Sequence, residues 1–316
     1  METQISEKLK QRFCKDNNIT VQIFSEPFFS ERLEAMGMHD KYLEFLNVLD
    51  VNFNNSEEEY FKYYNELKDT IIDYIKKSEA FESLNTCDMS KYATYTGLKQ
   101  SDVYKVPNIG KNFISIDIKK ANFSVLVHYA KETGTQFFDS YSWEDFMKQF
   151  TDIRYFAESK YIRQVVFGNC NPKRQVTYEK YLVTKILDEL ISNNCVEESD
   201  VYSISSDELI INVDSMKAVN VGKILDYIND INWIPLRITY FKLGKVENTD
   251  AYIKKIYDYH NWDIQLELKC VKPSESIFIH RALNKEELTE NDKVFISDGR
   301  LAKFIDIPKI RFVFNK

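Results

Sequence analysis

The sequence predicts an α+β protein built around a β-α-β-β-α-β unit, with a helical region before it and a mixed region after it. Three observations carry this prediction. Residues 1–110 are largely helical in their apolar periodicity. Residues 111–245 alternate short apolar strands with helices in the order that such a unit requires, and residues 246–316 mix both patterns. We therefore expect an antiparallel sheet in the middle of the chain.

Length and composition are those of a globular protein with room for one large or two modest domains. The chain has 316 residues, of which 44% are hydrophobic and 29% are charged. No apolar run reaches the ~18 residues of a membrane helix, so we expect no membrane partner. The polar N-terminus METQISEKLKQRF lacks the apolar core of a signal peptide.

Cysteine and histidine usage argues against a disulfide framework and against a zinc site. The five cysteines are an odd number without a C-x-x-C pair, and the four histidines share no metal-ligand spacing. A reducing compartment fits this usage best. We therefore expect a cytoplasmic protein.

Charge is spread unevenly along the chain. The net charge of −7 argues against a protein coated in basic side chains. Residues 1–100 carry 12 Lys and Arg against 18 Asp and Glu, whereas residues 240–316 carry 14 against 12. A nucleic-acid surface is therefore expected in the second half. The acidic N-terminal region is expected to support its neighbours or to dock a protein partner.

The helical region contains one long helix and two short ones. Ser56 is placed to cap a helix that runs to about Leu84, because three glutamates and a 3.6-residue apolar stripe follow it. Residues 27–49 predict two shorter helices, broken near Met36 and Gly37.

The middle region predicts strands and helices in alternation, and a tight hairpin with an acidic tip. Its expected elements are a strand at 113–118, helices at 121–131, 152–167 and 173–192, hairpin strands at 201–204 and 209–213, a helix at 216–230 and a strand at 236–241.

The last region is expected to hold a helix and several strands. The patterns indicate a helix at 249–259 and strands at 263–271, 277–280, 293–296 and 310–314.

Three acidic residues stand at positions that the topology brings together. Asp117 ends the first strand, and Asp207 and Glu208 lie at the tip of the hairpin. In this unit the first strand and the hairpin are neighbours, so the carboxylates should meet and should need a cation to ionise together. Each acid alone is most often a helix cap or a hairpin loop. Together they indicate a Mg²⁺ or Mn²⁺ site of the kind that serves phosphoryl transfer.

These residues resemble the palm motifs of template-dependent polymerases, most nearly those of family A DNA polymerases. The segment FISIDIKKANFSVLVH, with Asp117, resembles motif A, and YSISSDELII, with Asp207 and Glu208, resembles motif C. The segment KYIRQVVFG, residues 160–168, resembles the fingers helix called motif B, and residues 216–241 occupy the place of motif D. The resemblance covers residues 111–245. It implies a ferredoxin-like palm with a fingers insertion and a thumb-like region at 246–316.

The chain departs from family A in three respects. The spacing of Arg and Lys in the segment that resembles motif B does not align with that of the family. About 90 residues separate Asp117 from Asp207, which is nearer to the spacing in reverse transcriptases and viral RNA polymerases. Ser206 stands where motif C of family A usually has histidine. The resemblance therefore implies a minimal, divergent polymerase. A short chain rich in Lys, Asn, Ile and Tyr suits a viral or phage protein in the host cell.

The resemblance assigns roles to the acidic residues and names partners. Asp117 and Asp207 would hold two metal ions, Mg²⁺ or Mn²⁺, and Glu208 would be a third ligand or a support for the other two. The partners would be a nucleic-acid template, a primer and nucleoside triphosphates. Lys173 and Arg174, after the turn that follows the fingers helix, would contact a phosphate backbone.

The resemblance also assigns a nucleotide-binding set around the fingers helix. Lys160 and Arg163 lie three residues apart on one helical face and would bind the triphosphate, unless that face is simply solvated. Phe167, followed by Gly168, would stack on the incoming base, unless it packs in the core. Asn122 lies where related palms distinguish ribose from deoxyribose, and asparagine leaves that choice open.

Two other functions remain open at this point. A nucleotide cyclase of the GGDEF type shares the palm core, and the sequence Ser205-Ser206-Asp207-Glu208 is similar to its hairpin. Its acidic motifs usually lie closer together than those of this chain. A non-catalytic palm that only binds nucleic acid is the other alternative, against which the intact acidic residues argue.

Overall fold

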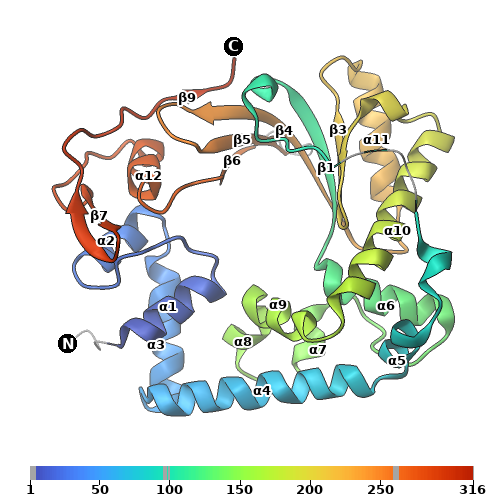
Figure 1. The fold of residues 1–316 in the computed structure, drawn as a ribbon, viewed down its shortest axis with the longest axis horizontal. Helices are drawn as coiled ribbons and strands as arrows, with labels where there is room; N and C mark the ends of the chain where they lie inside the picture. Colours follow the sequence, from blue (N-terminus) through green and yellow to red (C-terminus); the bar gives the residue numbers. More distant parts are fainter. Residues whose placement is uncertain (1–4, 95–97, 99, 259–262, 316) are drawn as a thin grey trace.

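The computed structural model describes residues 5–94, 98, 100–258 and 263–315. Figure 1 shows three groups of elements. The N-terminal helices lie at the left and along the bottom, the middle region lies at the right, and the C-terminal region runs along the top and down to the N-terminal helices. The chain is an α+β protein, as the sequence predicts.

The N-terminal region is helical, as expected, but its long helix is divided. Ser78 has an extended backbone (ψ 144°), ends one helix and caps the next by accepting a hydrogen bond from the Phe81 amide. The predicted helix from Ser56 to Leu84 is therefore two helices. The helices of this region are α1 Glu7–Asp16, α2 Phe28–Ala35, α3 His39–Phe53, α4 Glu57–Lys77 and α5 Glu79–Thr86, with 3₁₀ turns η1 Met89–Tyr92 and η2 Val106–Asn108.

The middle region contains the predicted strands and helices in the predicted order. One expected helix, 152–167, is divided at Ser159, which caps the second half and donates a hydrogen bond to Asp16 of α1. The elements are β1 Asn112–Ile118, α6 Ala121–Thr133, α7 Trp143–Met147, α8 Arg154–Glu158, α9 Lys160–Gly168, α10 Pro172–Ser192, η3 Glu198–Asp200, β2 Val201–Ile204, β3 Glu208–Asn212, α11 Ala218–Asp230 and β4 Leu236–Val246.

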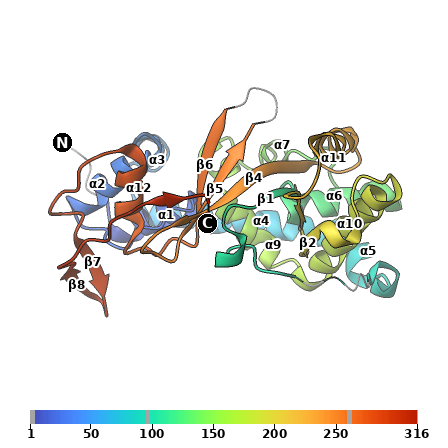
Figure 2. The same cartoon turned by 90° about the horizontal axis from the view of Figure 1, so that it is seen from above.

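Seven of the described strands form one sheet in which the paired neighbours are antiparallel. Its order is β2-β3-β1-β4-β5-β6, with β9 paired to β4. The added strands are β5 Tyr252–Tyr257, β6 Ile264–Lys269 and β9 Phe312–Val313. Figure 2 shows β4, β5 and β6 side by side between the N-terminal helices and the middle region.

The two faces of the sheet have different surroundings. Ile114, Ile116 and Ile118 of β1 belong to the large apolar core that α6, α10 and α11 share. The alternate residues of β1 point to the opposite face, because side chains alternate along a strand. There Phe113 packs with Phe241 in a small cluster, and the rest of that face, which carries Ser115 and Asp117, is called the open face.

Two predictions for the C-terminal region are wrong. Residues 249–259 are expected to be helical, but Tyr252–Tyr257 form β5, because β4 continues to Val246 and offers a free edge for pairing. Residues 277–280 are expected to be a strand, but they belong to helix α12, Ser276–Asn284. Its run of apolar residues packs on α2 and on the segment after β8, and a short apolar run does not distinguish a strand from a buried helix.

The C-terminal region connects the sheet to the N-terminal helices. A small two-stranded sheet, β7 Val294–Ser297 and β8 Arg300–Lys303, follows α12. Arg32 of α2 donates a hydrogen bond to the carbonyl of Val294 at 2.6 Å, and Asn284 donates to the carbonyl of Ala35 at 3.0 Å. These contacts hold the two ends of the chain against each other. Within the described residues, none of the helices has both the length and the apolar character that crossing a membrane requires.

Candidate active site

The three acidic residues lie at one end of the two central strands. Asp117 of β1 is directly opposite Glu208 of β3 in the strand register. The amide of Ile118 donates a hydrogen bond to the carbonyl of Asp207 at 3.0 Å. The hairpin thus brings Asp207 and Glu208 next to Asp117, as the predicted topology requires.

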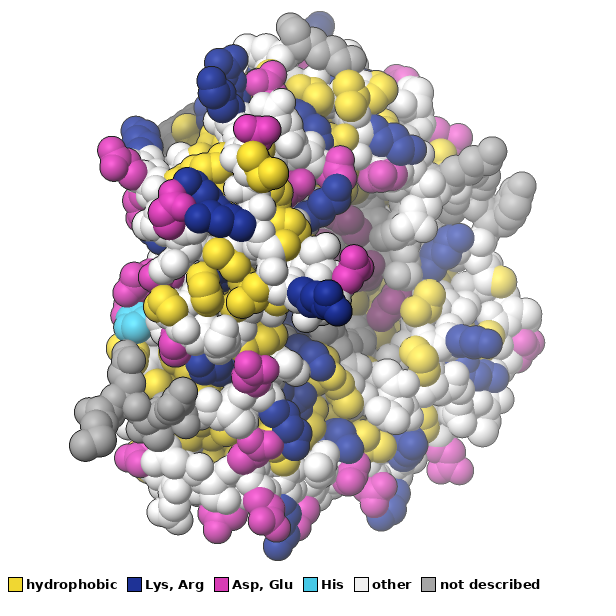
Figure 3. Space-filling model, turned by 60° about the vertical axis from the view of Figure 1, so that its left-hand side comes forward, with side chains coloured by type: hydrophobic (Ala, Val, Ile, Leu, Met, Phe, Trp, Pro, Cys, Tyr) yellow, Lys and Arg dark blue, Asp and Glu magenta, His cyan; other side chains and the backbone are white. Residues whose placement is uncertain are grey.

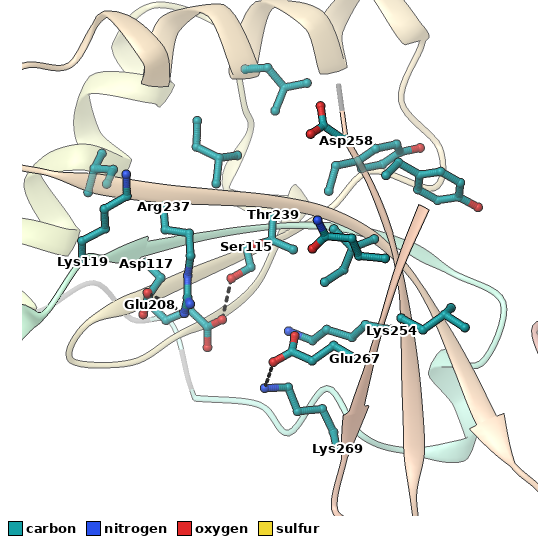
Figure 4. A pocket seen from close by; sticks show the side chains of 18 of the residues that line it. Ser115, Asp117, Lys119, Glu208, Arg237, Thr239, Lys254, Asp258, Glu267 and Lys269 are labelled. Carbon is teal, nitrogen blue, oxygen red and sulfur yellow. Dashed lines mark hydrogen bonds and ion pairs between the residues drawn. The ribbon is translucent and has the colours of Figure 1, made fainter. Parts of the chain in front are cut away.

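A buried serine holds one of these acids in place. Ser115 lies two residues before Asp117, on the same open face of β1, and is 4% exposed. Its hydroxyl donates a hydrogen bond to Oε1 of Glu208 at 2.5 Å (Figure 4). Glu208 therefore has a fixed orientation across the open face.

Arg237 pairs with Asp117, which the sequence analysis missed. It is opposite Asp117 in the register of β4, and its Nη2 lies 2.8 Å from Oδ2 of Asp117. Burial raises the pKa of Asp117, Arg237 opposes that rise, and the charges of Asp207 and Glu208 add to it, so that the pKa stands above its ordinary value. Apolar and polar side chains alternate at the start of residues 236–241, and this pattern is the sequence signal that would have placed Arg237 on the open face.

The larger of two cavities at this site has a volume of about 800 Å³. The acids Asp117 and Glu208 lie at one side of it, and Lys254, Glu267 and Lys269 of β5 and β6 lie at the other (Figure 4). On the face of the molecule seen in Figure 3, basic and acidic side chains are interspersed rather than separated. The mixed charge of this cavity is in keeping with that surface.

The second cavity, of about 510 Å³, brings the acids together with residues of α9. It shares Asp117 and Asp207 with the first cavity and is also lined by Asn122, Lys160 and Arg163. On α9, Lys160 and Arg163 lie three residues apart on the cavity side, while the apolar residues of the helix face the core. These five residues, far apart in sequence, thus share one cavity.

The positive charge of Arg163 is only weakly balanced by acidic side chains. Burial lowers its pKa, and the charge of Glu144 opposes that change. Glu144 is itself paired with Lys120. Among the described residues, the buried Nε of Arg163 has no hydrogen-bond partner.

Glu179 of α10 is a fourth acidic residue of the site, and the sequence analysis missed it. It is 7% exposed and lines the second cavity. Burial and, after it, the charge of Asp207 raise the pKa of Glu179 to about 7, and a hydrogen bond from Ser206 opposes the rise. Glu179 lies three residues before Leu182 and seven before Ile186 on the buried stripe of α10, and this spacing is the signal that would have found it.

Four residues of the predicted site line neither cavity. Phe167 is 1% exposed and packs with its ring centre 6.1 Å from that of Trp143, which is the core-packing alternative. Gly168 lies exposed at the end of α9, and Lys173 is exposed in the first turn of α10. Arg174 donates hydrogen bonds to the carbonyls of Leu84 and Cys87, both at 2.9 Å, and so joins α10 to α5.

The acidic residues suit a cation that also takes ligands from a substrate. In the part of the chain that the structure describes, no three Asp, Glu, His or Cys side chains are grouped to hold a metal ion by themselves. Mg²⁺, however, is commonly held by one or two carboxylates together with substrate phosphates and water. The guanidinium of Arg237 lies beside Asp117 where such a cation would be attracted, and its side chain is 66% exposed and so free to move aside.

A search with models of known protein families and a search of curated protein sequences both find no match to this chain. The proposal below therefore rests on the fold and on the geometry of the site.

Proposed function

We propose that the chain is a template-dependent nucleotidyltransferase, a DNA or RNA polymerase with a palm at residues 111–245. The chain order β1-α6-β2-β3-α11-β4 and the sheet order β2-β3-β1-β4 are those of a ferredoxin-like unit, and they support a palm. Helices α7 to α10 would be the fingers insertion. Residues 246–316 would act as the thumb.

One observation carries the proposal. Asp117, Asp207 and Glu208 meet at one end of β1 and β3, and the cavity beside them contains Lys160 and Arg163 of the predicted fingers helix. Carboxylates for metal ions and cations for phosphates are the two requirements of phosphoryl transfer from a nucleoside triphosphate.

The acids would hold Mg²⁺ or Mn²⁺. Asp117 and Asp207 would be the ligands, and Glu208, held by Ser115, would support them or add a ligand. Of two such ions bound there, one would lower the pKa of a 3′-hydroxyl and the other would neutralise the charge of the pyrophosphate leaving group. Arg237 would leave Asp117 and become available to a phosphate of the substrate.

The second cavity would receive the nucleoside triphosphate. Arg163, whose Nε has no partner among the described residues, would grip two phosphate oxygens, and Lys160 would contribute a single charge. Asn122 lines the same cavity, where it would contact the sugar or the phosphates. Phe167, being buried, would support α9 from the core.

The test is nucleotide incorporation with matched variants. The full chain, supplied with Mg²⁺, a primer annealed to a longer template and either ribo- or deoxyribonucleoside triphosphates, should extend the primer in template order. Asp117→Asn should abolish extension, whereas Asp226→Asn, an exposed acid of α11 that lines neither cavity, should leave it unchanged. A cyclic nucleotide as the product would indicate the cyclase instead. No product with any template or triphosphate would refute the proposal.

A further inference from the structure

Lys254 of β5 is a lysine buried in the wall of the larger cavity. Its residue is 5% exposed, and its register partners Leu243 and Glu267 place it on the open face, the same face as Asp117. Figure 4 shows its amine directed into the cavity, on the side toward Glu208. The proposed reaction gives this residue no role.

The ammonium group of Lys254 has no ion-pair partner among the described residues. No carboxylate oxygen of those residues lies within 4.0 Å of its Nζ, and the Nζ lies over the face of Phe241, 4.3 Å from the ring centre. The two carboxylates whose charges act on it are engaged elsewhere: Glu267 pairs with Lys269 at 2.6 Å, and Glu208 accepts a hydrogen bond from the Ser115 hydroxyl.

A buried ammonium without a carboxylate is costly, because desolvation is not offset by an ion pair. Burial accordingly lowers the pKa of Lys254, and Lys269 lowers it further, while Glu267 and Glu208 oppose the change. The charge of such an ammonium group is balanced when an anion enters the cavity. Arg237 and Lys269 line the same cavity and would share that anion.

The position of the cavity indicates which anion it would receive. The two cavities meet at Asp117 and Asp207, and the one beside α9 has the cations that suit a triphosphate. The larger cavity extends from the acids over β4, β5 and β6, which is the direction left for the strand whose 3′ end would reach Asp117. A phosphodiester of that strand is an anion of the right kind, and the aromatic residue Tyr104 also lines the cavity.

We propose that Lys254 binds a backbone phosphate of the nucleic-acid strand that is extended at Asp117, within the larger cavity. This inference rests on the proposed polymerase function. It divides the two substrates between the two sides of the acidic residues, with the triphosphate on the α9 side and the strand on the β4–β6 side.

The first experiment compares Lys254→Met with Lys255→Met in the full chain. Lys255 is the next residue of β5, points to the opposite face and lines neither cavity. Affinity for a fluorescent primer–template is measured by anisotropy, without nucleotide, over a range of salt concentrations. Lys254→Met should weaken binding roughly ten- to a hundredfold and reduce the salt slope by about one. Lys255→Met should change neither quantity.

Competition separates the two sources of phosphate. Unlabelled primer–template should displace the probe from the wild-type chain far better than inorganic phosphate does at equal phosphate concentration. Equal competition by inorganic phosphate would overturn the assignment to a strand. Equal affinity of wild type and Lys254→Met would overturn the role of Lys254, and it would do so even if the wild-type chain extends primers normally.

A second measurement does not depend on the variant's folding. A primer with a photoreactive base a few nucleotides before its 3′ end, irradiated in complex with the wild-type chain, should cross-link to peptides of residues 236–258 or 263–269. Cross-links confined to other regions would overturn the inference. If the chain binds the strand through Lys254 but extends no primer, the proposed polymerase function falls and the phosphate site stands.

Discussion

Glu179 allows the electrostatics of the site to be tested without any substrate. Its pKa is raised to about 7 by burial and by Asp207, so the folded chain favours the neutral carboxyl group. A glutamate of this kind contributes its full stability below its ordinary pKa of 4.5, and that contribution is lost as the pH rises through about 7. The Glu179→Gln variant resembles the neutral form at every pH and should therefore keep this contribution to stability as the pH rises.

The expected magnitude follows from the two pKa values. The difference between 4.5 and about 7 corresponds to about 3 kcal/mol of unfolding free energy when the group is fully ionised. Because Glu179 is only 7% exposed, solvent screens little of this energy. Glu179→Gln should therefore equal the wild type at pH 4.5 and below, and exceed it by up to about 3 kcal/mol near pH 8.5.

Urea unfolding at several pH values measures this difference directly. The buffer should contain a chelator, so that no metal ion compensates the acidic residues. Asp188→Asn is the control, because Asp188 is an exposed acid of the same helix that lines neither cavity. A Glu179→Gln variant whose stability relative to the wild type is independent of pH, or falls as the pH rises, would refute the reasoning.

The remaining predictions concern the proposed reaction and its supporting core. Asp117→Asn and Asp207→Asn should each abolish Mg²⁺-dependent incorporation, with unchanged or higher stability, because each removes one of several like charges; near-normal synthesis by either variant would show that its acid is no metal ligand. Arg163→Ala should weaken apparent nucleotide affinity about ten- to a hundredfold with little effect on nucleic-acid binding, and unchanged affinity would contradict the placement of α9. Phe167→Leu should destabilise the fold by roughly 1–2 kcal/mol and leave the KM for nucleotide within about twofold at a temperature where the variant is folded; a large rise in KM would instead support a stacking role.

The β-α-β-β-α-β order of the middle region was predictable because its signals are local. The strand ending at Asp117 and the hairpin carrying Asp207 each stand out by apolar composition between turn residues, and helical periodicity identifies α6, α10 and α11. Two strands and one hairpin in that order leave few ways to pair, so the proximity of the acids followed from sequence. The divisions at Ser78 and Ser159 did not follow, because one capping serine within an amphipathic pattern does not by itself end a helix.

Only the tertiary structure decided how the C-terminal region folds and which cations surround the acids. Residues 252–257 become a strand because β4 continues beyond residue 241 and its backbone groups need partners, a condition that no local pattern reveals. Arg237, Lys254 and Glu179 reach the site from β4, β5 and α10, and their proximity depends on strand register and on helix packing. The sequence alone thus determined the acidic residues and their strands, because alternation and turn chemistry act over a few residues. The groups that set the charge around them come from distant segments, and their positions depend on how those segments pack.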